Sequence, residues 1–302
     1  FQVYELGRRV QHIDMLAFHQ IESLATPYPY PIQGHAQFAI VFWNESQQHF
    51  IWFLKLPLDE QGLLSPAPRS QFIEMVLTAQ GQDPTQPLTD EQQDRLANNP
   101  FSFKPSQEKL ALFNALVRKQ LGLKASIQYE FAMQYLSSQI APSEWQHIGL
   151  QGLSDVCVRL NELDHEQHIL ASFDHAAIEV QIALCQCLEH LQLTEAIAEK
   201  IFSKFIKAPN EYQSYYMRAL ASQSELSQQA LAHLQHTDQL DANALISIAG
   251  RNWSILKQEL SRSIYLEALA LQPQAFFNQV FADIVAIPSL RNQLLGELRN
   301  PN

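Results

Sequence analysis

The hydrophobic pattern of the first hundred residues predicts a small module that mixes strands and helices. β-Branched and aromatic residues fill 37–43 and 49–54, and the connection between these two runs is polar. That pattern is typical of a β-hairpin. The same reasoning assigns three further segments: a strand over 2–6 and helices over 13–24 and 70–80.

From Ser106 onward the apolar positions recur at helical spacing. Ser106 is an N-cap candidate for a helix that ends at Gly122, and 124–138 continues as a second helix. Further helices are expected near 143–160, 164–173, 174–190, 194–207, 210–222, 224–235, 241–250, 252–271, 273–286 and 288–299. Their cap candidates are Asp164, Asp174, Thr194, Asn210, Ser224 and Asp241.

Short links between these helices make them antiparallel neighbours in pairs. Each pair spans about 30 residues, which is the size of a helical repeat. We therefore expect a HEAT-like α-solenoid. The sequence has no repeated pattern, so an irregular helical array is the alternative.

The distribution of proline marks the division between the mixed N-terminal part and the helical remainder of the chain. Ten of the 15 prolines lie in residues 27–105, so that part must be rich in loops. The sequence predicts a mainly α protein with an N-terminal α+β module over 1–105. A helical repeat-like array follows over 106–302.

Composition narrows the possible functions. The net charge is −11 and no cluster of lysine and arginine exists, which argues against nucleic acid and against anionic membranes as partners. An odd count of three cysteines favours a reducing cytoplasm. We expect neither a transmembrane helix nor a signal peptide, because no apolar run reaches 18 residues and residues 1–30 lack the required pattern.

Both faces of the predicted hairpin are apolar, which is unusual because antiparallel sheets commonly leave one face to solvent. Helices 13–24 and 70–80 can cover one face. The helical array covers the other, or a second copy of the hairpin does so in a homodimer. The candidate interaction surface consists of Val41, Trp43, Trp52 and Phe53 of the hairpin, together with Arg8 and Arg9.

The densest polar cluster is Asp164-His165-Glu166-Gln167-His168. His165 and His168 are spaced to share one face of a helix, where two imidazoles can hold a metal ion. Asp164, Glu166 or His175 would add a ligand. The competing interpretation is a solvated first turn of a helix, with Asp164 as its cap, and the sequence favours it. We expect no metal and no cofactor.

Two charged pairs and one cysteine pair are weaker candidates for a functional site. Arg8 and Arg9 follow the first strand and form a possible grip for a carboxylate or phosphate, although salt bridges to Asp14, Asp59 or Glu60 are the simpler interpretation. The pair Asp59-Glu60 fits a solvated turn better than acid–base chemistry. Cys185 and Cys187 would point in different directions on a helix, so we interpret them as small buried hydrophobic residues.

Three segments carry a resemblance to a known family: FLKLPLDEQGLL at 53–64, FSFKP at 101–105 and IAGRNW at 248–253. With them the chain resembles an uncharacterised family of bacterial proteins of similar length, over nearly its whole extent. The resemblance implies a bacterial and cytoplasmic protein. It implies no activity and no site residue.

The sequence thus leaves the function unknown, but it favours one class of function. A helical array presents a long surface, so a non-catalytic protein-interaction or scaffold role with an unidentified protein partner is the leading hypothesis. The alternative is an enzyme or metal-binding protein that uses the His165/His168 region or the Arg8/Arg9 region.

Overall fold

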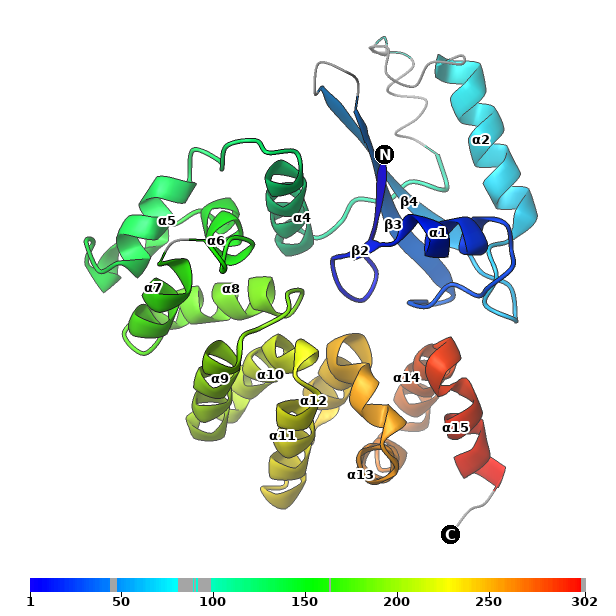
Figure 1. The fold of residues 1–302 in the computed structure, drawn as a ribbon. Coiled ribbons are helices and arrows are strands. Elements are labelled where there is room, and N and C mark those ends of the chain that lie inside the picture. The colour runs from blue at the N-terminus through cyan, green and yellow to red at the C-terminus, as the bar shows by residue number, and fades with distance from the viewer. Residues whose placement is uncertain (44–47, 81–88, 90, 92–98, 163, 300–302) are drawn as a thin grey trace. The chain divides into compact units, whose positions relative to one another are not determined.

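A computed structural model describes residues 1–43, 48–80, 89, 91, 99–162 and 164–299. By their contacts the residues form two compact units (Figure 1). Unit 1 comprises Phe1–Pro105 together with Phe281–Asn302, and unit 2 comprises Ser106–Val280. The predicted array 106–302 differs from this grouping in its last residues, because 281–302 cluster with the sheet. Whether either unit folds alone stays a prediction.

Unit 1 contains a four-stranded antiparallel sheet in the order β2-β1-β3-β4. The predicted hairpin is present, and β3 and β4 pair along their whole length from His35↔Pro57 to Trp43↔His49. The turn residues 44–47 lie outside the described residues. A strand that the sequence analysis missed, β2, pairs with β1. The bounds are β1 Gln2–Glu5, β2 Gln11–Ile13, β3 His35–Trp43 and β4 His49–Pro57.

Two helices cover one face of this sheet, as predicted. Asp14 caps α1 (Met15–Glu22) by accepting hydrogen bonds from the amides of Leu16 and Ala17. The second helix is α2 (Pro66–Gln80). The core between these helices and the sheet is built from Val3, Ile13, Ile21, Tyr28, Ala36, Phe38, Leu54, Leu56, Leu64, Phe72 and Val76.

Residues 101–105, the segment FSFKP, cover the outer edge of β4. The amide of Lys55 donates to the carbonyl of Phe101 at 2.7 Å, and the amide of Phe103 donates to the carbonyl of Phe53 at 3.2 Å. The rings of Phe53 and Phe103 pack edge to face. This pairing satisfies backbone groups that an open sheet edge would expose.

The end of the chain is tied to the same unit. The last two helices are α14 (Gln274–Val285) and α15 (Pro288–Arg299), and the first crosses the boundary between the units. Arg291 of α15 donates to the carbonyl of Glu60 at 3.0 Å. Residues more than 200 positions apart in the sequence therefore share one unit, which the composition of the chain does not reveal.

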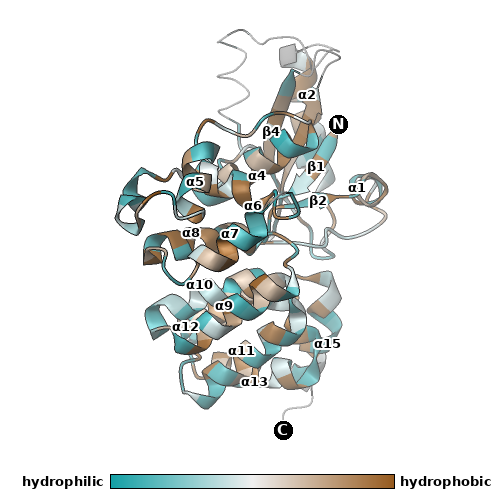
Figure 2. Cartoon of the chain, turned by 60° about the vertical axis from the view of Figure 1, so that its left-hand side comes forward, coloured by the Kyte–Doolittle hydropathy of each residue, from teal (hydrophilic) through white to brown (hydrophobic). Residues whose placement is uncertain are grey.

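Unit 2 is a two-layered stack of helices. One layer runs α5, α7, α9, α11, α13, and the other runs α6, α8, α10, α12, with neighbours in contact along each layer (Figures 1 and 2). Most of these helices carry both apolar and polar residues, as amphipathic helices do (Figure 2). The bounds are α4 Gln107–Gln120, α5 Tyr129–Leu136, α6 Leu150–Cys157, α7 His165–Ser172, α8 Ile178–Leu188, α9 Glu195–Lys207, α10 Asn210–Ala219, α11 Ser224–His236, α12 Ala242–Ser247 and α13 Glu259–Ala270.

Two predicted helices are interrupted. The segment 143–160 begins as a 3₁₀ turn over Pro142–His147, and α6 starts only after Gly149. The segment 252–271 is preceded by a π-helix over Ile248–Asn252 and begins with a 3₁₀ turn over Trp253–Lys257, before α13. Tertiary contacts of the residues in this bend override the local helical pattern.

The cap predictions succeed at two positions. Thr194 accepts from the amide of Ile197, and Asp241 accepts from the amide of Ala244. Asp164 occupies the N-cap position of α7 but makes no side-chain capping hydrogen bond. The assignments of Asn210 and Ser224 are wrong, because these are the first residues of α10 and α11 themselves. Asp174 lies outside a helix that begins only at Ile178.

Candidate functional site

Asp174 binds two lysines instead of a helix end. It lies in the connection between α7 and α8, and α9 presents Lys200, Lys204 and Lys207 at a spacing of four and three residues. That spacing places the three ammonium groups on one face of the helix. The Asp174 carboxylate is 2.5 Å from the Lys200 ammonium and 3.0 Å from that of Lys204.

These residues border a cleft of about 740 Å³ within unit 2. This volume falls within the usual range of small-ligand sites. The cleft is lined by residues of α8, α9 and α10 and of their connections, and α10 contacts both α8 and α9 in the stack. Figure 1 shows these helices. Its lining consists of Asp174, Ile178, Gln181, Lys200, Ser203, Lys204, Lys207, Ala208, Pro209, Tyr212 and Tyr216.

A hydrogen-bonded pair fixes one part of the lining. The Tyr216 hydroxyl donates to Oε1 of Gln181 at 2.8 Å, and Nε2 of Gln181 donates to the carbonyl of Ala176 at 2.9 Å. Both side chains are buried. Burial raises the pKa of Tyr216 to about 12, so its hydroxyl stays neutral and acts as a fixed donor.

The local charge of the cleft opposes that of the chain. Three lysines and one aspartate line it, a formal balance of +2 in a chain of −11. Hydrogen bonds from Lys200 and then Lys204 lower the pKa of Asp174 to about 2. Asp174 is therefore ionised near neutral pH. No acidic side chain among the described residues forms an ion pair with Lys207, which is exposed.

This arrangement suits binding better than proton transfer. Efficient general acids and bases have pKa values near the working pH. The pKa values of Asp174 and Tyr216 are displaced far from neutrality, in opposite directions. The lysines present ammonium donors at the rim, and Ile178, Pro209 and the tyrosine rings add apolar surface. Such a lining can hold an anionic group flanked by apolar groups.

His165, one of the two metal candidates, uses both ring nitrogens in hydrogen bonds within unit 2. Its side chain is buried, its Nδ1 donates to the carbonyl of Glu162, and its Nε2 accepts from the Tyr129 hydroxyl at 2.6 Å. Metal binding through either ring nitrogen would break one of these bonds. His168 is half-buried, His175 is exposed, and Glu166 accepts from the Thr194 hydroxyl. In the part of the chain that the structure describes, no three His, Cys, Asp or Glu side chains are grouped to hold a metal.

We expect Tyr129→Phe to lower the free energy of unfolding of unit 2 by about 1–2 kcal/mol, because Nε2 of His165 would lose its donor in a buried position. Urea denaturation followed by far-UV circular dichroism measures this. Tyr215→Phe is the matched control, since the Tyr215 hydroxyl makes no hydrogen bond to another described residue. Equal effects of the two substitutions would contradict a structural role for the pair.

Arg8 is a buried structural cation. Its guanidinium donates to the Asp283 carboxylate and to the Asp283 carbonyl, both at 3.0 Å. The buried carboxylate of Glu5 accepts from the backbone amides of Arg8 and Arg9. The sequence analysis expected Asp14, Asp59 or Glu60 as partners, and the partner found is a residue of α14.

Asp59 forms a turn, which is the simpler of the two readings offered for it. Its carboxylate accepts from the amides of Gln61 and Leu63, both at 2.9 Å. Cys157, Cys185 and Cys187 are free thiols and are buried. The hydrogen bond that the Cys157 thiol makes to Cys187, together with burial, raises the pKa of Cys157, and burial raises that of Cys185.

The candidate interaction residues of the hairpin differ in exposure. Val41 is buried, at 1% exposure, whereas Trp43, Trp52 and Phe53 are half-buried. Trp52 packs edge to face on Phe72 of α2 and belongs to the core face of the sheet. Homodimerisation through this hairpin stays a prediction.

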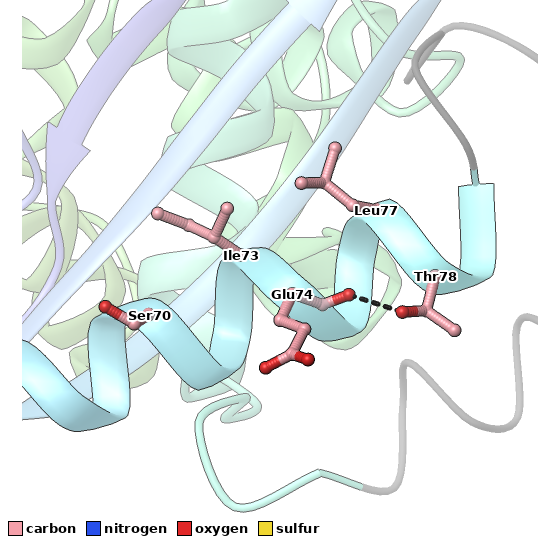
Figure 3. Close-up of a pocket in the computed structure, with 5 residues that line it drawn as sticks. All are labelled: Ser70, Ile73, Glu74, Leu77 and Thr78. Carbon is pink, nitrogen blue, oxygen red and sulfur yellow. Dashed lines mark hydrogen bonds between the residues drawn. The ribbon is translucent and has the colours of Figure 1, made fainter.

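A second hollow, of about 390 Å³, lies along α2 (Figure 3). Its lining comes from this one helix: Ser70, Ile73, Glu74, Leu77 and Thr78. Ile73 and Leu77 are about half exposed, at 45% and 55%. The Thr78 hydroxyl donates to the carbonyl of Glu74 within the helix. A single helix face offers few converging polar groups, so this hollow is the weaker candidate.

A buried carboxylate joins three elements elsewhere in unit 2. Glu189, directly after α8, receives two hydrogen bonds from Arg218 of α10, at 2.7 and 2.9 Å, and one from Arg251 of the π-helix. His190 lies 3.4 Å from the same carboxylate. Arg251 belongs to the segment IAGRNW, which the sequence analysis selected only for its resemblance. This cluster holds the stack together.

A comparison with known protein families identifies the family of this chain. A family profile described as "Protein of unknown function (DUF3549)" matches residues 1–302. The chain belongs to this family. Membership in DUF3549 confirms the predicted relationship to a family of unknown function, and it brings no activity. Neither a curated protein nor a solved structure gives a significant match. No described helix combines the length and the apolar character that crossing a bilayer requires.

The lysine cleft was missed at the sequence level, although half of its signal was present. Lys200, Lys204 and Lys207 are visibly spaced on one helix face in EAIAEKIFSKFIK. Their partner Asp174 is 26 residues from Lys200 and was assigned to a helix cap. The packing of α9 against α7, and of α10 against both α8 and α9, brings the two halves together.

Proposed function

We propose that this DUF3549 protein is a non-catalytic protein-interaction scaffold. In this proposal unit 2 is an α-solenoid of the HEAT type, and its cleft between α8, α9 and α10 receives a segment of a partner protein. The single observation that carries the proposal is this cleft. It combines three lysines with apolar and aromatic surface in a chain whose overall charge is strongly negative.

The architecture supports the proposal. Two-layered stacks of paired helices offer long surfaces built from successive repeats, and such surfaces bind partners. The pKa values of Asp174 and Tyr216 support binding over acid–base catalysis. The hydrogen bonds of His165 and the ion pair of Arg8 support structural roles for the residues that an enzyme or a metal site would have used.

We also propose a bacterial cytoplasm as the setting. Three buried free thiols support a reducing compartment. The bacterial origin rests on the sequence resemblance alone.

Site-specific photocrosslinking in the cells that make the protein tests the scaffold proposal. A benzoylphenylalanine in place of Ser203 lies in the cleft lining, and one in place of exposed Glu195, in the first turn of the same helix, is the control. We expect discrete protein adducts from position 203 that position 195 does not give. Absence of adducts at 203, or identical adducts at both positions, would contradict the proposal.

A further inference from the structure

The cleft already holds one carboxylate. Asp174 reaches it from the connection between α7 and α8 and pairs with Lys200 and Lys204, leaving Lys207 at the open end of the lysine face. The Asp174 side chain is 42% exposed, and those of Lys200 and Lys204 are 29% and 26% exposed. A pair this accessible is exchangeable, because exposed ion pairs contribute little net free energy.

The charge distribution selects the kind of ligand. Nucleic acids bind through broad positive surfaces that neutralise many phosphates. Here three lysines line one cleft of a chain that as a whole carries −11, so an extended polyanion is repelled. A short acidic group that enters the cleft meets these three lysines and the single carboxylate of Asp174. The adjacent Ile178, Pro209 and Tyr212 favour apolar side chains beside that group.

We propose that the cleft binds an acidic segment of a partner protein, in which a carboxylate flanked by apolar side chains pairs with Lys204 and Lys207, and that Asp174 is an internal competitor for Lys204. The proposal rests on the scaffold function and adds the chemistry of the partner and its regulation. Asp174 lowers the affinity in two ways: it occupies Lys204, and it repels the incoming carboxylate.

Fluorescence anisotropy with the full-length chain tests this inference. The probe is a fluorescein-labelled short peptide of alternating glutamate and leucine, and its matched control has glutamine in place of glutamate. We expect the glutamate peptide to bind more tightly than the glutamine peptide, and sodium chloride to weaken the binding. A single-stranded DNA oligonucleotide of equal charge that binds as tightly would overturn the choice of partner.

Three variants separate the roles of the charges. Lys207→Gln is expected to weaken binding about threefold, and Lys207→Arg to restore it, because an exposed charge pair contributes a modest amount. Asp174→Asn is expected to strengthen binding about three- to tenfold. Asp238→Asn, which changes an aspartate outside the cleft lining, should leave the affinity unchanged. Circular dichroism confirms that each variant is folded.

The outcomes distinguish this inference from the scaffold function. If Asp174→Asn weakens binding or leaves it unchanged, Asp174 is not a competitor. If the glutamate and glutamine peptides bind equally, the acidic chemistry is wrong. In either case, crosslinks from position 203 would still support a scaffold whose cleft receives another kind of segment.

Discussion

Replacing Glu189 with glutamine is expected to lower the free energy of unfolding of unit 2 by about 3 kcal/mol or more. The Glu189 side chain is 2% exposed and receives hydrogen bonds from Arg218 and Arg251. Glutamine keeps the shape but removes the charge, so both guanidinium groups lose their counterion. Removing one partner of a buried ion pair typically costs about 3–5 kcal/mol, because an uncompensated charge remains.

The pH dependence follows from the pKa of Glu189. Burial by itself raises the pKa of a carboxyl, but Arg251, His190 and Arg218 outweigh this and lower it to about 2, against a usual value of 4.5. Because the folded-state pKa lies below the unfolded one, the contribution is fully present above pH 4.5 and is lost as the pH falls toward about 2. The difference between wild type and Glu189→Gln should therefore shrink below pH 4.5.

Hydrogen exchange with mass spectrometry measures the loss of stability of the Glu189→Gln variant within unit 2. A local measurement is needed because a chain with two units need not unfold in one step. Faster exchange is expected in α8, α10 and the π-helix of the Glu189→Gln variant. Glu179→Gln, an exposed position in the first turn of α8, is the control and should change stability by less than about 1 kcal/mol. A loss for Glu189→Gln as small as that of the control would contradict the counterion role.

The sequence predicted elements where short-range patterns decide them. The hairpin β3–β4 follows from dense β-branched and aromatic residues, and α9 follows from its apolar spacing and from Thr194 as its cap. The mainly α class with an N-terminal α+β module is confirmed on the same grounds. β2 was missed because three residues, Gln11–Ile13, are too few for a period to appear.

Long-range electrostatics account for what the sequence did not predict. The π-helix at the junction of the predicted helices 241–250 and 252–271 contains Arg251 and Asn252. Arg251 reaches Glu189, 62 positions earlier, and the Asn252 side chain donates to the carbonyl of Met217 and to the hydroxyl of Ser227. Nothing in the local pattern of IAGRNW marks these partners. Asp174 is a comparable case, since an aspartate between two helical patterns is most simply read as a cap.

The candidate sites chosen from the sequence share one weakness. His165, Arg8 and Asp59 were noticed because polar residues of one kind lie close together in the chain. The structure shows that each uses its polar groups to fix local or tertiary structure. The cleft emerged instead from residues of three elements, each unremarkable alone. Proximity in sequence is a poor guide to a site in a stack of helices, because each helix supplies only one face.

Replacing Asp283 with asparagine is expected to destabilise unit 1 by about 2–4 kcal/mol. One carboxylate oxygen of Asp283 accepts from the Arg8 guanidinium at 3.0 Å, and the other accepts from the amide of Gln33 at 2.8 Å. Asparagine cannot accept from both, since one of its two polar atoms is itself a donor. It also removes the counterion of a guanidinium that is 1% exposed. We place the loss below the full cost of a broken buried pair because Glu5 lies beside Arg8 and retains its charge.

The same substitution tests whether the C-terminal helices hold the N-terminal sheet. If they do, hydrogen exchange in Asp283→Asn should rise both in α14 and α15 and in β1 and the loop that follows it. Those segments meet through Arg8 and Asp283, which are 275 positions apart in sequence. Glu74→Gln, at an exposed position of α2, is the control in the same unit. Faster exchange in α14 and α15 alone would mean that the sheet is stable without them, and that residues 281–302 are an appendage to unit 1, not a part of its fold.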